Sequence, residues 1–171
     1  MIAFCRSYLV DLIKNDVQCN TVYTRAEDES RFKPLVFALV LVGNERLEKD
    51  GSRVAKEDDL TNGLRRYRYR VYKSTLPVFV TIVGKSLEQS ENFRQNFLTK
   101  INDRIIDPEG NAIDVRVTEC NLIQELNTGS IQNPREGYEF TVEFSGGVYL
   151  DKTVNIITGE PVPTPEIIKE G

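Results

Sequence analysis

The sequence predicts an α+β fold, with a mostly antiparallel sheet, two main helices packed on one face and a long charged β-arm or loop. Three observations lead to this prediction. Two segments repeat apolar residues at helical spacing, several segments alternate apolar and polar residues, and turns rather than crossover helices join the consecutive strands. The length of 171 residues suits one domain. We expect this domain over residues 1–158 and a Pro-rich extended tail over residues 159–171.

Two helices are expected. In the first segment, the apolar side chains share one face, as in an amphipathic helix. They are Ile2, Cys5, Leu9, Leu12 and Ile13. The second helix starts at the capping box Ser86-Leu-Glu-Gln89, in which the serine caps the helix and the glutamine reaches back to the N–H of the cap residue. Its helical spacing continues to about Arg104.

Several strands are expected on either side of the second helix. Leu35 to Val42 is apolar at every position, which is typical of a strand that is covered on both faces. Leu64 to Lys73 alternates, and Leu76 to Val83 alternates again after Ser74-Thr75, which is expected to turn the chain.

In the C-terminal part of the domain, residues typical of turns again separate the expected strands. Asp107 to Asn111 has the composition of a turn, and a half-buried strand is expected from Ile113 to Val117. Tyr138 to Phe144 alternates with acidic residues. Gly146-Gly147 is then expected to turn the chain into a short strand, Val148 to Leu150.

Residues 44–63 are polar and charged and are interrupted by glycines. A connection of this length inside a domain is usually functional or disordered. We expect a mobile loop that becomes an arm if the flanking strands pair as a hairpin. The cluster Glu57-Asp58-Asp59 is interpreted as a solvated part of this loop in preference to a divalent metal site. The candidate assembly residues of the arm are Arg46, Lys49, Arg53, Lys56, Glu57, Asp58 and Asp59.

The rare residue types argue against several kinds of chemistry. The chain has no histidine, which removes the commonest general base and every zinc site that contains histidine. Its three cysteines are odd in number and form no Cys-x-x-Cys pair, so they are expected to be reduced and mostly buried. No phosphate-binding or nucleophile motif occurs. The net charge is −4, and no apolar run reaches membrane-spanning length. We therefore expect no catalytic residue, no cofactor and no metal, and we expect no signal peptide.

The segment from Leu64 to Lys73 is the most unusual, with five basic side chains and three tyrosines. Arg66, Arg68, Arg70 and Tyr72 share one face of the expected strand, and Tyr67 and Tyr69 are expected on the other face, in the core. The arginine row has three interpretations: charge pairing within the chain, contact with an acidic strand of a neighbouring subunit, or binding of nucleic acid. The candidate subunit interface comprises Arg66, Arg68, Arg70, Tyr72, Glu139 and Glu143.

The order of these elements resembles that of tail terminator (tail completion) proteins at the head–tail junction of long-tailed bacteriophages. The similarity consists of the N-terminal helix, the charged excursion from Val42 to Leu64, the Arg/Tyr strand that leads into Leu76-Pro-Val-Phe-Val80, and the helix capped by Ser86. The resemblance implies a protein without a catalytic site. It also implies an oligomeric ring, commonly a hexamer, that stops tube polymerisation and presents a surface to the neck.

We therefore expect a non-enzymatic virion protein of a phage or prophage tail, assembled in the cytoplasm of the bacterial host. It would cap the tail tube or join it to the neck. The expected partners are other copies of the chain, tail tube proteins and neck proteins, with nucleic acid only indirectly involved and with no membrane or small-molecule substrate. The alternatives are a small carboxylate-using enzyme or ligand-binding domain, and a nucleic-acid-associated adaptor.

Overall fold

The structure is a computed structural model that describes residues 1–28, 35–124 and 136–156. Of these residues, 57% lie in strands and 22% in helices, so the fold is mostly β and the predicted α+β class is wrong. A short helical segment also begins at Ala26. The labelled elements are α1 (Ile2–Asn15), β1 (Val22–Tyr23), β2 (Phe37–Val42), β3 (Arg46–Asp59), β4 (Leu64–Gly84), α3 (Leu87–Lys100), β5 (Arg104–Ile106), β6 (Ala112–Gln124) and β7 (Glu136–Asn155).

The strands form one curled, mixed sheet in the order β1-β2-β4-β7-β6-β5, with β3 attached to β4. The parallel pair is β1 with β2, in which Val22 lies opposite Ala38. The prediction of a mainly antiparallel sheet under two packed helices is therefore wrong. The extended piece expected at Thr21 to Arg25 is present as β1, but its parallel pairing was not predicted, because it has only two residues. The helical segment at Ala26 was also missed, because it lies in a highly charged part of the sequence. Neither feature is long enough to produce a periodic apolar pattern.

The two longest strands run through the positions where turns were predicted. β4 has 21 residues and β7 has 20, and Ser74 lies opposite Gly146 between them. The small residues allow close packing rather than a turn: a Cβ atom on Gly147 would lie 2.7 Å from Cδ of Arg70. β4 accommodates its twist with a β-bulge between Arg70 and Tyr72.

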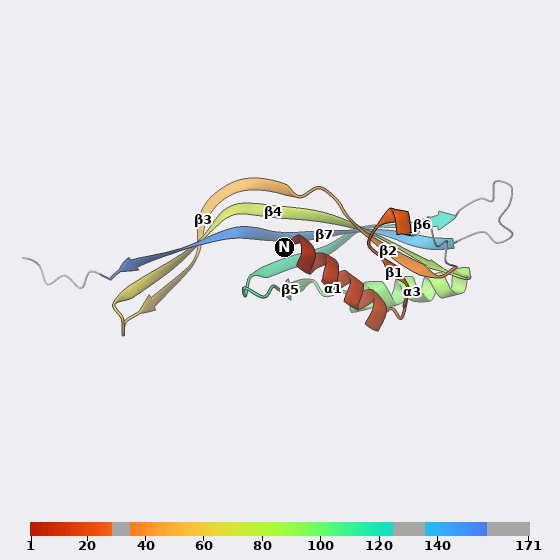
Figure 1. Cartoon of the computed structure of the whole chain (residues 1–171), viewed down its shortest axis with the longest axis horizontal. Helices are drawn as coiled ribbons and strands as arrows, with labels where there is room; N and C mark the ends of the chain where they lie inside the picture. The colour runs from red at the N-terminus through yellow and green to blue at the C-terminus, as the bar shows by residue number, and fades with distance from the viewer. Residues whose placement is uncertain (29–34, 125–135, 157–171) are drawn as a thin grey trace, which may run out of the picture.

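The hydrophobic core lies between one face of the sheet and the helices α1 and α3 (Figure 1). Leu76, Val78 and Val80 of β4 face the core opposite Phe144, Val142 and Phe140 of β7. The Phe140 ring lies 4.6 Å from the ring of Phe97 in α3. The predicted apolar face of the first helix is confirmed for its four buried members, Cys5, Leu9, Leu12 and Ile13.

The buried thiols take no part in a disulfide bond. Cys5 and Cys19 are buried free cysteines, and Cys120 is exposed. Burial raises the pKa of the Cys5 and Cys19 thiols to about 11, because a thiolate is poorly solvated there. Both therefore act as small apolar side chains of the core.

The start of α3 is built as the capping box predicts, with one difference. Ser86 Oγ accepts a hydrogen bond from the Gln89 N–H at 3.3 Å. Gln89 Oε1 accepts from the N–H of Lys85 at 2.9 Å, rather than from the N–H of the cap residue. One turn into the helix, buried Ser90 Oγ accepts from the N–H of Gly84 at 2.9 Å and donates to the carbonyl of Glu136 at 2.7 Å. The Ser90 hydroxyl thus joins α3 to the ends of β4 and β7.

Replacing Ser90 tests this connection. Ser90→Ala is expected to lower the free energy of unfolding by about 1–3 kcal/mol, because it leaves a buried donor and a buried acceptor without a partner. Urea unfolding followed by circular dichroism measures the change. Thr99→Ala, which removes an exposed hydroxyl from the same helix, is the matched control. Equal losses of unfolding free energy from the two substitutions would show that the Ser90 hydrogen bonds stabilise the fold no more than an exposed hydroxyl does.

Candidate assembly interface

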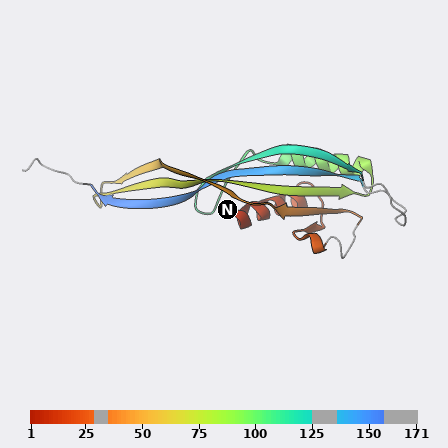
Figure 2. The ribbon, with the colours of Figure 1, turned by 90° about the horizontal axis from the view of Figure 1, so that it is seen from above.

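A three-stranded arm projects from the body of the protein, beyond the helices (Figures 1 and 2). We define the arm as residues 46–73, which hold β3 and the first half of β4, together with residues 146–155 of β7. Of the two forms predicted for residues 44–63, the projecting arm is present and the loop is not, because most of that segment is strand β3. Nine of the 14 residues of β3 are charged, so the strand lacks the apolar face by which strands are recognised.

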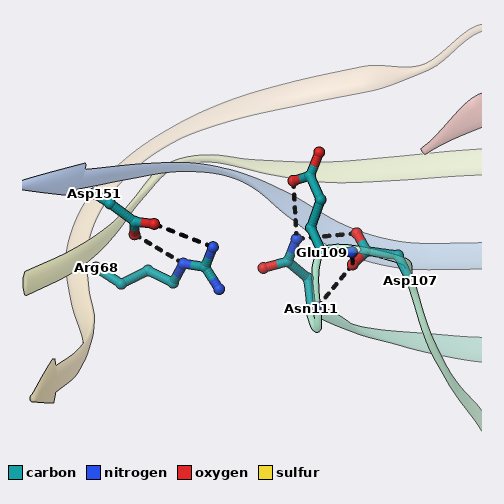
Figure 3. A network of polar contacts seen from close by, with 5 residues as sticks. All are labelled: Arg68, Asp107, Glu109, Asn111 and Asp151. Carbon is teal, nitrogen blue, oxygen red and sulfur yellow. Dashed lines mark hydrogen bonds and ion pairs between the residues drawn. The ribbon is translucent and has the colours of Figure 1, made fainter.

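The first face of the arm, the arginine face, carries Arg66, Arg68 and Arg70, as the alternation predicted. The structure pairs two of these arginines within the chain. Arg68 Nε lies 2.9 Å and Arg68 Nη2 3.3 Å from the two carboxylate oxygens of Asp151 in β7 (Figure 3). Arg70 donates to Asp50 in β3. Arg66 lies exposed and makes no ion pair with any residue that the structure describes. Intrachain pairing therefore accounts for Arg68 and Arg70.

The two predicted acidic partners lie far along the same sheet. Glu143 is opposite Pro77 and Glu139 is opposite Thr81, in the body. Both share the face of β7 that carries Asp151, because residues of the same parity in a strand point to the same side. Glu143 and Asp151 are eight residues apart, or about 26 Å along the strand. The structure thus places the arginine row and the two glutamates on one face but at opposite ends.

The second face of the arm, the tyrosine face, carries Tyr67, Tyr69 and Tyr72. The prediction that Tyr72 shares the arginine face is wrong, because the β-bulge in β4 reverses the alternation before this residue. The prediction that Tyr67 and Tyr69 lie in the core is wrong: both are half-buried on the arm, because the helices that cover the same face of the body do not reach it. The guanidinium of Arg53 lies 5.4 Å from the ring centre of Tyr67, and the ammonium of Lys152 lies 5.6 Å from that of Tyr69.

The tyrosine face also contains apolar residues that the sequence interpretation missed. Val148, Leu150 and Val154 of β7 are between 45 and 48% exposed. Their even spacing after Gly146-Gly147 was the available signal. It was overlooked because the two glycines were interpreted as a turn.

The remaining arm residues hold the strands together at the tip. Asp58 accepts from Nε of Arg65 at 2.5 Å and lies 3.4 Å from Nζ of Lys56. Asp59 accepts from the N–H of Asn62 at 3.2 Å and from its Nδ2 at 2.8 Å, which closes the turn between β3 and β4. Glu57 lies opposite Arg66, Arg46 opposite Thr75 and Lys49 opposite Tyr72. The acidic cluster thus serves the hairpin, and no metal-binding group of three or more acidic or thiol side chains occurs within residues 1–28, 35–124 and 136–156.

The arm and the body carry opposite net charges. Residues 46–73 and 146–155 contain ten basic and six acidic side chains, a net charge of +4. The described residues of the body contain eight basic and fifteen acidic side chains, a net charge of −7. Opposite potentials of this kind attract two copies of a chain in an arm-to-body orientation.

The arm is expected to lose stability in acid. Hydrogen bonds from Arg70 lower the pKa of Asp50, and hydrogen bonds from Arg65 lower that of Asp58. A carboxylate with a lowered pKa stabilises the fold above its unfolded pKa of about 3.9 and loses this effect as the pH falls through its folded pKa. Asp50→Asn with Asp58→Asn should therefore reduce the drop in Tm between pH 5 and pH 2, measured by circular dichroism. Parallel curves for the variant and the parent would contradict the assignment.

A cleft of about 510 Å³ lies where the arm meets the body, and its acidic residues are Glu45, Asp107 and Glu109. The Asp107 carboxylate accepts hydrogen bonds from the Glu109 N–H at 2.9 Å, the Asn111 N–H at 2.8 Å and Asn111 Nδ2 at 3.0 Å (Figure 3). Although desolvation raises the pKa of Asp107, these hydrogen bonds outweigh it and lower the pKa overall. The predicted turn at residues 107–111 is thus confirmed, and a carboxylate held ionised in this way suits the turn better than proton donation to a substrate.

Comparison with known proteins adds no family: no protein-family model and no curated protein matches the chain. The part of the chain that the structure describes contains no helix long and apolar enough to cross a membrane. The arm, with its two exposed faces and its charge opposite to that of the body, is therefore the candidate functional site.

Proposed function

We propose that the protein is a non-enzymatic structural protein that assembles into a ring, with the arm of one copy lying against the body of the next. The observation that carries the proposal is the positively charged arm projecting from a negatively charged body. An arm-to-body contact joins two different surfaces, and a contact of this kind generates a ring when the rotation closes.

The exposed apolar side chains support an assembly role. Seven of the thirteen large apolar side chains that are exposed in the described residues lie on the arm, although the arm is the smaller part of the molecule. They are Leu47, Val54, Leu60, Tyr72, Val148, Leu150 and Val154. Such a concentration is typical of a surface that contacts another protein. Nucleic-acid binding is less well supported, because Arg65, Arg68 and Arg70 already hold carboxylates of the same chain.

The contact is expected to join exposed cations of the arm to the acidic open face of a neighbouring body. Arg66 on the arginine face and Arg53 on the tyrosine face are exposed and make no ion pair with any described residue. Glu139 and Glu143 lie on the face of the sheet that the helices leave uncovered. Tyrosine and arginine side chains contribute strongly to protein interfaces, and the arm presents both.

The biological setting follows from the resemblance to tail terminator proteins. In that setting the ring caps a phage or prophage tail tube or joins it to the neck, and tail tube and neck proteins bind its two sides. The bacterial host cytoplasm is where such a ring would assemble. The support for this setting is the order of elements together with an arm long enough to reach a neighbouring subunit.

Charge reversal on the arm tests the proposal. Light scattering over a range of concentrations, with negative-stain imaging, should show a multi-subunit ring for the parent protein. Arg53→Glu with Arg66→Glu should shift the mass to the monomer, because it reverses two exposed arginines of the arm that make no ion pair with any described residue. Arg6→Glu with Lys14→Glu makes the same change in net charge on exposed positions of α1 and should leave the ring intact. A parent protein that stays monomeric at every concentration, or equal effects of the two variants, would refute the proposal.

A further inference from the structure

The outer edge of β7 is open along the arm. In the body, β6 pairs with β7 as far as Asp114 opposite Ser145. Beyond that point, β4 is the one partner of β7 among residues 1–28, 35–124 and 136–156. The N–H of Ile156 donates to the carbonyl of Gly63 at 2.7 Å, on the β4 side. The N–H and C=O groups of successive residues alternate between the two edges of a strand. Because the even-numbered Ile156 faces β4, the backbone groups of the odd-numbered residues of β7 point to the open edge. These residues are Gly147, Tyr149, Asp151, Thr153 and Asn155.

The opposite edge of the arm is protected, and the β7 edge is not. β3 carries nine charged residues and two irregularities in its register with β4, features that discourage pairing with another strand. Residues 149–155 pair with β4 in unbroken register, and the irregularity next to Tyr149 is the bulge on β4 rather than on β7. Residues 147–155 contain two charged residues, Asp151 and Lys152, of opposite sign. An unprotected edge of this kind is a template for a further strand.

We propose that the open edge of β7 pairs antiparallel with the same edge of a second copy of the chain, with the two Leu150 residues opposite each other. In such a pair, residues whose backbone N–H and C=O groups point to the shared edge lie opposite residues of the same kind. The two-fold axis therefore passes between two copies of one residue. An axis at Asp151 or at Lys152 would place like charges opposite each other, which is unfavourable. An axis at Leu150 pairs residues 147–153 of both copies, a longer match than an axis at Tyr149 or Thr153 allows.

In this register, each side chain finds a compatible partner. Leu150 meets Leu150, Lys152 meets Val148, and Asp151 meets Tyr149 of the other copy. Val148 and Leu150 are among the exposed apolar residues of the tyrosine face, so the contact buries apolar surface and also supplies partners for the open backbone groups. The contact is two-fold and uses a strand edge, whereas the proposed ring uses the faces of the arm. It thus goes beyond the proposed function and would join two rings or two free copies.

A cysteine at position 150 tests the register. In a Cys120→Ser background, Leu150→Cys should form a covalent dimer in oxidised glutathione, because Leu150 occupies a non-hydrogen-bonded pair whose Cα atoms lie about 4.5 Å apart. Val154→Cys lies on the same strand and is equally exposed, but it is offset from its copy, so it should cross-link at least tenfold more slowly. Equal rates, or no dimer from Leu150→Cys on a non-reducing gel, would overturn the proposal.

Sedimentation equilibrium gives an independent measurement without oxidation. Leu150→Lys places two ammonium groups opposite each other and should weaken the two-fold contact at least tenfold, whereas Val154→Lys should not. A two-fold contact of unchanged strength in Leu150→Lys would refute the pairing. A ring without the Leu150 cross-link would refute only this contact, and a cross-linked dimer without a ring would refute only the proposed ring.

Discussion

Phe140→Ala is expected to lower the free energy of unfolding by about 3–5 kcal/mol, among the largest effects of any single core substitution. Phe140 is fully buried at the centre of β7, between Val80 and Cys120 on the neighbouring strands. Its ring also packs against Phe97 of α3, so truncation opens a cavity between the sheet and the helix. Urea unfolding followed by circular dichroism measures the loss.

The control for this substitution is Phe79→Ala. Phe79 is 39% exposed and lies on the face of β4 that the helices do not cover. Its truncation removes less contact and leaves space that water fills, so the expected loss is a fraction of that for Phe140. If the two losses were equal, the core would not be located between the helices and the sheet.

Gly137→Ala is expected to be almost as damaging, although it adds a single methyl group. A Cβ atom at position 137 would lie 2.6 Å from the carbonyl oxygen of Ile82 and 2.9 Å from Cγ2 of Val83. The backbone of β4 must move to relieve this overlap, which costs about 1–3 kcal/mol or more. The expected result is a clear fall in Tm, measured by differential scanning calorimetry.

A second glycine separates overlap from backbone strain. Gly51 has a φ of +77° and open space around its Cα atom, so Gly51→Ala introduces only the strain of a left-handed backbone, about 1–2 kcal/mol. Because Gly51 lies in the arm, we expect its effect to be confined to the arm. A larger global loss from Gly51→Ala than from Gly137→Ala would contradict this account of the β7 contact.

Both main helices were predictable because each combines helical spacing with a clear local signal. Ser86 caps the second helix as expected, although that helix ends at Lys100 rather than near Arg104. The fold class was not predictable, because the features that decide it lie in the long strands. Ser74 and Gly146 have turn-forming composition, yet they lie side by side in the sheet, where a Cβ atom on Gly146 would lie 3.0 Å from Sδ of Met1. Local composition does not distinguish a turn from a close approach.

The candidate interface was predictable in part. Alternation alone placed Arg66, Arg68 and Arg70 on one face. Their carboxylate partners were not predictable: Asp50 is 20 residues from Arg70 in sequence and Asp151 is 83 residues from Arg68. Pairing over such separations depends on the register of three strands, which a single sequence does not specify. Strand β3 was missed for a related reason, because its stability comes from charge pairing with β4 rather than from a buried face.

The continuity of β4 and β7 from body to arm has a consequence for the order of folding. The β3–β4 hairpin closes through a four-residue tip, residues 60–63, so it can form locally. β7 joins it only after the chain between Gly84 and Glu136 has been synthesised and the body has brought the two long strands together. We expect β7 then to pair with β4 progressively, from the body towards the tip of the arm. We therefore expect the pairing edge of β7 to form only on a chain whose body has folded.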